Sequence, residues 1–176
     1  DSKRITLFST LNPVLVKPNY EETIKLLSLP FYHSNRKDQL KPYGKQLTKL
    51  CQSGIIALTL DCEGSLIFQN GELICTISAP PVINKHVSGA GDTYISASLL
   101  ALLSGASLQQ MATIATSAAV TAIEKEHTAL CKLQELNIAL SPRQKFLSGH
   151  SKIKATLKSY QEQGKRVVFT NGCFDI

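Results

Sequence analysis

The sequence predicts an α/β layered domain in which helices cover both faces of a sheet that includes one β-hairpin. Residues 55–60 are apolar except for Thr59, and such a run is typical of a strand buried on both faces. Asn70-Gly71 lies between two β-prone runs and is the strongest short-range signal for a two-residue hairpin turn. Residues 93–123 carry no charge and are interrupted at residues 104–107, which indicates two buried helices rather than one membrane span.

The amino-terminal part is expected to contain two short strands and two helices. Residues 5–8 and 14–16 are β-prone, and the second run ends in a Lys-Pro-Asn turn. A helix is expected from that turn through about residue 27, and another over residues 41–51. Lys17, the first residue of the turn, is as well explained as a solvated residue at a strand end.

The next part of the chain is expected to bring three loops together. Further β-prone runs follow the buried strand, over residues 66–69, 72–77 and 82–83. A glycine-rich turn comes next, and the helix after it is expected to begin at Asp92 or Thr93. Because ligands collect at the carboxyl ends of strands in such sheets, we expect convergence of the loops after residue 16, after residue 60 and before Asp92.

Composition limits the classes of function. The 176 residues, of which 43% are hydrophobic, suffice for one domain or for one domain and part of another. The net charge of +6 comes from scattered basic residues and aromatic residues make up only 6%, so a nucleic-acid-binding domain ranks last. No secretory signal pattern precedes the first predicted strand, and we expect a cytoplasmic protein without membrane insertion and without a nucleic-acid partner.

The cysteines and histidines predict no metal site, because both residue types are dispersed and match no zinc or redox spacing. We interpret the five cysteines as reduced thiols: Cys51, Cys62, Cys75, Cys131 and Cys173.

The turn Gly89-Ala90-Gly91-Asp92 combines an anion site with a candidate base. Two glycines permit a tight turn, and the helix that follows aims its unpaired N–H groups back at it, so these amides would hold phosphate oxygens. Asp92 would accept the proton of an attacking hydroxyl while the amides and a metal stabilise charge on a transferring phosphoryl group. The alternative is that Asp92 only caps the helix, and the four residues alone favour neither interpretation. Tyr94 stands where a dinucleotide fingerprint has its third glycine, and the lysine that closes a P-loop is absent.

Four ordered segments resemble the carboxyl-terminal half of the ribokinase-like (PfkB) sugar kinases. The segments are residues 1–3, 17–22, 59–64 and 89–93. The resemblance implies that residues 1–141 are the nucleotide-binding half of a three-layer ribokinase-like domain. It also implies that Asp92 is the catalytic base and that the anion hole consists of Gly89, Ala90 and Gly91.

The same resemblance implies a site for ATP and Mg²⁺. Thr59 and Gly64 would lie near the nucleotide phosphates, as in the family's T-x-G-x-x-G pattern, and Asn19 and Glu22 would organise the metal through phosphates or water. From the residues alone, Asn19 and Glu22 are also explained as a helix cap and a first-turn acid. Asp61 replaces the first glycine of the pattern, and an acidic side chain beside phosphates is unfavourable unless it points away or meets the metal.

The end of the chain resembles a second family. After a polar linker over residues 142–150, an amphipathic helix following Ser151 and a strand over residues 167–169 lead into residues 170–176. This order resembles the opening of a cytidylyltransferase-like nucleotidyltransferase domain, here residues 151–176, which stops before the family's catalytic histidines. A ribokinase-like domain fused to such a domain resembles bifunctional enzymes that phosphorylate heptose 7-phosphate and adenylylate heptose 1-phosphate for ADP-heptose, a lipopolysaccharide precursor.

The expected function is therefore ATP- and magnesium-dependent phosphoryl transfer to a sugar hydroxyl, with heptose 7-phosphate as the first candidate substrate. The expected partners are ATP and a sugar phosphate, and a homo-oligomer stays open. We expect the first part of the kinase sheet to lie outside this sequence, so that the chain alone lacks most of the sugar site and transfers no adenylyl group. The alternatives are a nucleotide-binding or regulatory module without turnover, and a PfkB kinase for another sugar.

Overall fold

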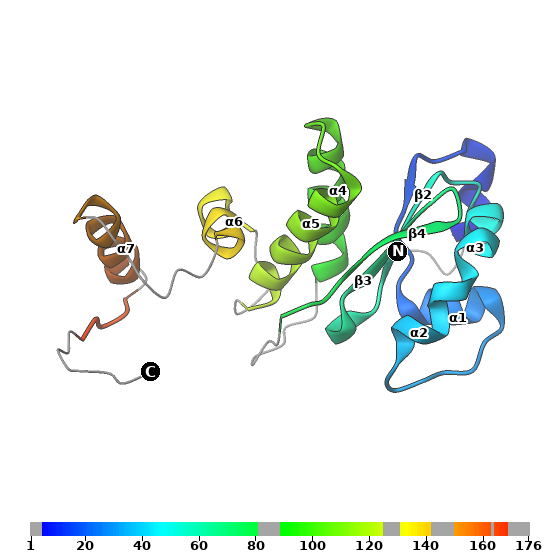
Figure 1. The fold of residues 1–176 in the computed structure, drawn as a ribbon, viewed down its shortest axis with the longest axis horizontal. Coiled ribbons are helices and arrows are strands. Elements are labelled where there is room, and N and C mark those ends of the chain that lie inside the picture. The colour runs from blue at the N-terminus through cyan, green and yellow to red at the C-terminus, as the bar shows by residue number, and fades with distance from the viewer. Residues whose placement is uncertain (1–4, 81–88, 125–130, 142–149, 163, 169–176) are drawn as a thin grey trace. The chain divides into compact units, whose positions relative to one another are not determined.

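The computed structural model describes residues 5–80, 89–124, 131–141, 150–162 and 164–168. The chain divides into two compact units, residues 1–140 and residues 141–176. The first unit contains the sheet and most of the helices (Figure 1).

The sheet of the first unit has four strands in the order β1-β2-β3-β4. The strands are β1 (Leu15–Val16), β2 (Ile55–Thr59), β3 (Ser65–Gln69) and β4 (Glu72–Ile77). Strand β1 runs parallel to β2, and the other pairs are antiparallel. The turn between β3 and β4 has φ values of 50° at Asn70 and 88° at Gly71, as a two-residue hairpin turn requires. The predicted buried strand and hairpin are confirmed.

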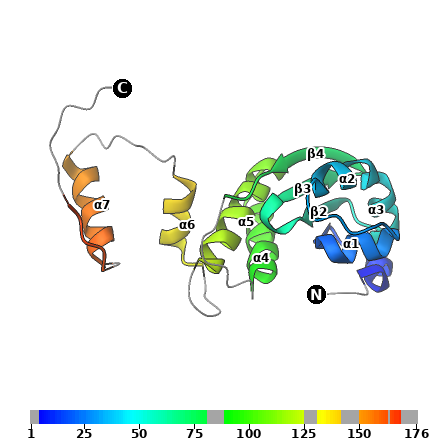
Figure 2. The same ribbon diagram turned by 90° about the horizontal axis from the view of Figure 1, so that it is seen from below.

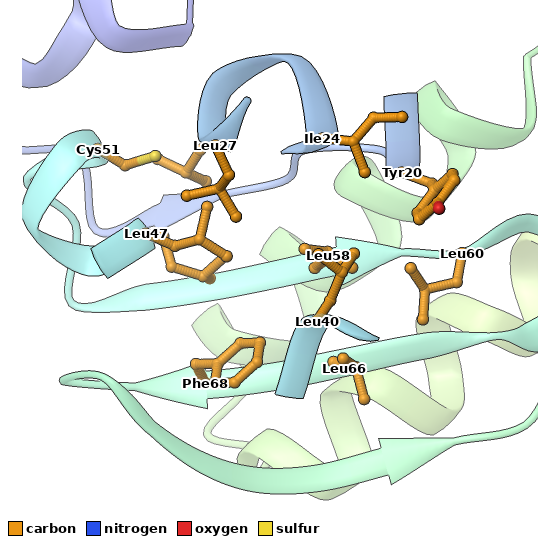
Figure 3. Close-up of a cluster of buried hydrophobic side chains, with 12 residues drawn as sticks. Tyr20, Ile24, Leu27, Leu40, Leu47, Cys51, Leu58, Leu60, Leu66 and Phe68 are labelled. Carbon is orange, nitrogen blue, oxygen red and sulfur yellow. The ribbon is translucent and has the colours of Figure 1, made fainter. Parts of the chain in front are cut away.

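Three helices cover one face of the sheet: α1 (Tyr20–Leu27), α2 (Arg36–Leu40) and α3 (Gly44–Cys51). The core on this face joins Leu58 of β2 and Phe68 of β3 to Ile24 of α1 and Leu47 of α3 (Figure 3). Because successive side chains of a strand point to opposite faces, Ala57 belongs to a separate core on the other side of the sheet.

Two long helices, α4 (Ala90–Leu103) and α5 (Leu108–Ile123), cover that second face and lie side by side (Figures 1 and 2). Small residues such as Ala112 and Ala115 are fully buried there, which allows close packing on the sheet. The break between the helices ends at Ser107, whose hydroxyl accepts from the Gln110 N–H in a capping box. The predicted pair of helices is confirmed, and no helix in the described part of the chain is long and apolar enough to cross a membrane.

Several predicted boundaries are wrong. Residues 5–8 belong to a 3₁₀ helix, η1 (Ile5–Leu11), and not to a strand, since a short β-prone run is stable only when another strand pairs with it. The predicted helix over residues 41–51 starts as a 3₁₀ turn, η2 (Lys41–Tyr43), before α3. Helix α4 begins at Ala90, two residues earlier than the first expected position. The β-prone residues 82–83 lie outside the described residues.

The first unit ends with α6 (Leu133–Leu140), which contacts α5. The second unit contains α7 (His150–Glu162), which confirms the amphipathic helix and begins one residue before Ser151. Val167 and Val168 form no strand, so the strand prediction is wrong for them, and the described residues of the second unit contain no other strand. Residues 169–176 lie outside the described residues.

Candidate active site

A cavity of about 850 Å³ lies where β1 and β2 end and α4 begins. Lys17 follows β1, Asp61 follows β2, and Gly91 belongs to the first turn of α4, and all three line the cavity. The predicted convergence of the three loops is thus confirmed. The parallel pairing of β1 and β2 brings two of the loops together, because it continues into an isolated bridge between Asn19 and Thr59.

Asn19 and Glu22 form a capping box at the start of α1. The Asn19 side-chain oxygen accepts from the Glu22 N–H at 2.8 Å, and the Glu22 carboxylate accepts from the Asn19 N–H at 2.9 Å. Asn19 lines the cavity and Glu22 does not. The helix-capping interpretation of this pair is therefore realised in the structure.

The loop after β2 forms a 3₁₀ turn, η3 (Asp61–Glu63), that ends at Gly64. Gly64 has a φ of 95°, and a Cβ there would collide with the Ile77 carbonyl oxygen, so only glycine fits between this loop and the end of β4. Thr59 and Gly64 both line the cavity, as expected for residues near a ligand. The Thr59 hydroxyl lies 3.4 Å from the Pro18 carbonyl oxygen across the β1–β2 junction.

Asp61 has a φ of 52°, in the left-handed region that favours glycine and that aspartate tolerates better than most residues. Residue 61 therefore has the backbone conformation that favours glycine, although the residue here is an aspartate. The Asp61 carboxylate pairs with the Arg36 guanidinium at 2.8 Å. Arg36 belongs to α2, a five-residue helix with no signal in the hydrophobic periodicity.

The start of α4 has no side-chain cap. Its N-cap is Gly89, which has a φ of 86° and offers no side-chain acceptor to the first N–H groups of the helix. Ala90 and Gly91 line the cavity directly. The Lys17 ammonium nitrogen lies 3.3 Å from the place that a Cβ on Gly91 would occupy, and within the described residues Lys17 forms no ion pair with a carboxylate.

Lys17 is the residue whose importance the sequence did not reveal. The glycine turn lacks the lysine of a P-loop in sequence, and the fold brings one to the same place from the end of β1. Only the strand order shows that residue 17 and residue 91 are neighbours. A half-buried lysine beside a helix start without a side-chain cap is an arrangement that can attract an anion.

Asp92 is the third residue of α4 and is exposed. It is not the N-cap residue, because Gly89 holds that position. Gly91 lines the cavity immediately before it, whereas Asp92 is not one of the lining residues. The carboxylate is accessible to solvent in the turn next to the anion site.

The rest of the cavity wall is largely apolar. Helix α5 contributes Ala119, Val120 and Ile123, and Ala79 and Pro80 follow β4. Tyr94 of α4 also lines the cavity; its hydroxyl donates to Ser65 at 3.2 Å, and burial raises the pKa of Tyr94. Cys62 of η3 and Thr116 of α5 are the remaining lining residues in the described part of the chain. The lining thus combines a polar set at the strand ends and the start of α4 with a set on α5 that is apolar except for Thr116.

Comparison with known proteins identifies the family. The family model described as pfkB family carbohydrate kinase matches residues 9–136. The chain belongs to the pfkB family of carbohydrate kinases. It is 34% identical over 167 residues to bifunctional protein HldE of a Nitratiruptor species, covering 92% of this chain and 35% of that protein. The chain spans about a third of the length of this relative.

Two solved structures have the same fold. Phosphofructokinase-2 from Escherichia coli, in complex with substrates and products, superposes with a TM-score of 0.65 at 22% identity, covering 78% of this chain and 44% of that one. Ribokinase from Arabidopsis thaliana, complexed with ribose and ATP, gives a TM-score of 0.61 at 23% identity, covering 76% and 41%. The expected ribokinase-like α/β fold with a mixed sheet is confirmed. The start of a nucleotidyltransferase domain at residues 151–176 stays a prediction.

Proposed function

We propose that this chain forms the ATP-binding part of a sugar kinase, with Asp92 as the general base. The proposal depends most on one observation: the Lys17 ammonium lies beside the uncapped first turn of α4 in a cavity that also has an apolar wall. A nucleoside triphosphate matches these two parts of the cavity, because its phosphates are anionic and its base is flat and largely apolar. Family membership supports the kinase class.

The polar and apolar lining residues orient the nucleotide in this proposal. The phosphates bind Lys17 and the amides of Ala90 and Gly91, where the helix dipole favours negative charge. The base packs on Val120 and Ile123 of α5. Thr59 and Gly64 bound the phosphate region from the β2 side.

Asp92 then acts on the acceptor. Its exposed carboxylate takes the proton of a sugar hydroxyl, and the resulting oxygen attacks the γ-phosphorus of ATP. The bond between the γ-phosphorus and the bridging oxygen breaks, and ADP leaves with that electron pair. Lys17 and the α4 amides, Gly89 to Gly91 included, stabilise charge on the transferring group.

Asn19 and Glu22 fit a magnesium ion that arrives with the nucleotide and keeps several of its waters. The capping box already uses an oxygen of each side chain, and the described residues contain no cluster of three candidate metal ligands. Such outer-sphere binding is usual for Mg²⁺, which dehydrates reluctantly. When bound, the ion would neutralise phosphate charge, and these two residues would order its waters.

The similarity to proteins named HldE favours heptose 7-phosphate as the acceptor. The chain spans about a third of that relative, so the activity and the substrate are proposed for the whole protein. In the same proposal residues 1–141 are the kinase part, residues 142–150 the linker and residues 151–176 the start of the nucleotidyltransferase, and the protein acts in the cytoplasm.

Replacing Asp92 with asparagine in the whole protein tests the proposal. We expect kcat for heptose 7-phosphate phosphorylation to fall roughly 10²- to 10⁴-fold with little change in ATP affinity, because only proton removal is lost. Asp38→Asn is the matched control, since Asp38 is also the third residue of its helix and is exposed. Unchanged turnover in Asp92→Asn would remove Asp92 from this role. ATP binding without any turnover by the natural protein would favour the regulatory module.

A further inference from the structure

We propose that Arg36 is a positioning residue for the nucleotide site, which holds the Asp61 carboxylate away from the phosphates. The inference rests on the proposed nucleotide site and adds a residue that lies outside the cavity lining. It starts from a charge conflict, because Asp61 lines the same cavity as the anion site formed by Lys17 and Gly91. An unpaired carboxylate there would repel a triphosphate.

Arg36 is fixed independently of Asp61. Its guanidinium carbon lies 4.5 Å from the centroid of the Tyr20 ring and 5.4 Å from that of Phe31, and the two rings meet edge to face. The Arg36 Nε donates to the Tyr32 carbonyl oxygen at 3.1 Å. Only 13% of the Arg36 side chain is exposed, against 68% for Asp61. The Arg36 side chain is therefore held in place by contacts other than the ion pair. The ion pair in turn determines the orientation of the Asp61 carboxylate.

A second contact fixes the same loop to the same helix. The Glu63 carboxylate faces the backbone N–H groups of Arg36 and Lys37 at the start of α2, at 3.3 and 3.4 Å. Both ends of the turn Asp61–Glu63 therefore contact α2, Asp61 through the ion pair and Glu63 through the backbone N–H groups. This attachment also explains how a non-glycine residue keeps a φ of 52° in the cavity wall.

The residues that contact the Arg36 guanidinium are connected to the cavity. Tyr20, on which the guanidinium stacks, directly follows the cavity-lining Asn19 and is buried. Its hydroxyl donates to Gln39 of α2 at 2.7 Å and accepts from the Tyr32 N–H at 2.7 Å. Helix α2 is therefore held against the start of α1, and Arg36 sits at a defined distance from the loop after β2.

A role of Arg36 in neutralising Asp61 has a measurable consequence that a purely structural role of Arg36 lacks. Without the guanidinium, the Asp61 charge is released toward the phosphates, so affinity should fall for ATP and not for adenosine, which carries no phosphate. Removing the Asp61 charge as well should restore ATP binding. High salt should also reduce the defect, since an exposed carboxylate is screened.

The test measures dissociation constants for ATP and adenosine by calorimetry on the whole protein. We compare the natural protein with Arg36→Met, Asp61→Asn and the double variant, and use Lys45→Met as a control that breaks an exposed ion pair with Glu72. Arg36→Met is expected to weaken ATP binding roughly tenfold with adenosine unchanged. The double variant should bind ATP within about twofold of Asp61→Asn, and in turnover assays KM for ATP should rise while kcat stays constant.

The assignment would be overturned by an ATP affinity in the double variant as low as in Arg36→Met, or by equal losses for ATP and adenosine. If Arg36→Met does not fold, Arg36→Gln keeps a planar polar group over Tyr20 and replaces it in every comparison. Failure of the natural protein to bind ATP would instead refute the proposed function, whatever the variants do. Normal ATP binding by Arg36→Met would refute only the role of Arg36.

Discussion

Two helices begin at the cavity, and they differ in whether a side chain caps the N–H groups of the first turn. Helix α1 starts with a complete capping box, in which Asn19 and Glu22 accept from each other's backbone N–H groups. Helix α4 starts at Ala90, after the N-cap Gly89, with no side-chain cap, and the Lys17 ammonium approaches its second residue, Gly91. The same cavity therefore borders one helix start with a side-chain cap and one that has none among the described residues.

In the proposed function, the residues at the capped start of α1 stabilise the fold, and those at the uncapped start of α4 bind a ligand. A capped helix start gains about 1 kcal/mol from its own side chain, which satisfies one of the unpaired N–H groups of the first turn. An uncapped start beside a lysine leaves that N–H group to water or a ligand and concentrates positive potential, which favours an anion. Asn19 and Lys17, two residues apart, should therefore respond differently to substitution.

The largest expected effect is that of Lys17→Met on nucleotide binding. Loss of charged hydrogen bonds to phosphate should weaken ATP binding roughly 10- to 100-fold, measured by calorimetry without magnesium. The urea unfolding midpoint should stay the same, because Lys17 forms no ion pair with a described carboxylate. Lys25→Met, which breaks an exposed pair with Glu21 on α1, is the control. Equal ATP binding by both variants would mean that the α4 start is not the anion site.

Asn19→Ala should show the reverse pattern. Losing the cap is expected to lower the free energy of unfolding by about 1 kcal/mol, measured by urea denaturation. Affinity for magnesium-free ATP should change by less than about threefold, since the N–H group that the Asn19 side chain satisfies, that of Glu22, belongs to α1. Ser107→Ala removes the corresponding cap of α5 and should cost a similar amount of stability. A large loss of ATP affinity in Asn19→Ala alone would remove the contrast between the two helix starts.

The smallest effect is expected for Gly91→Ala, which should raise the stability of the protein and lower its affinity for ATP. Alanine favours the helix, so the free energy of unfolding should rise by about 0.5 kcal/mol. The new Cβ would lie 3.3 Å from the Lys17 nitrogen and would push the ammonium aside, so ATP affinity should fall by about threefold. Thermal unfolding and calorimetry on the same sample measure both changes. A rise in ATP affinity would show that Gly91 does not need close approach to the ligand.

The sequence predicted features that are encoded locally. The Asn70-Gly71 turn is specified by two residues, and the buried strand β2 by a run over residues 55–60 that is apolar except for Thr59. The capping box of α1 could be predicted as one of two interpretations, because both partners lie within four residues of each other. The start of α4 was placed too late because aspartate is a better cap than glycine in general, whereas here Gly89 turns the chain.

Features that depend on the fold could not be predicted in this way. Lys17 and Gly91 are separated by 74 positions and meet only because β1 lies next to β2 and α4 packs on the same sheet. Arg36 is 25 positions from Asp61 and belongs to a helix too short to leave a periodic pattern. In both cases the residue types were visible in the sequence and their pairing was not.

A crystal structure of the whole protein with a non-hydrolysable ATP analogue tests the central claim most directly. We expect phosphate oxygens within hydrogen-bonding distance of the Lys17 ammonium and the Gly91 N–H, with the base against α5. We also expect the Asp61 carboxylate to stay paired with Arg36. A triphosphate bound away from the start of α4, or one whose phosphates contact the α5 wall instead, would refute the proposed nucleotide site.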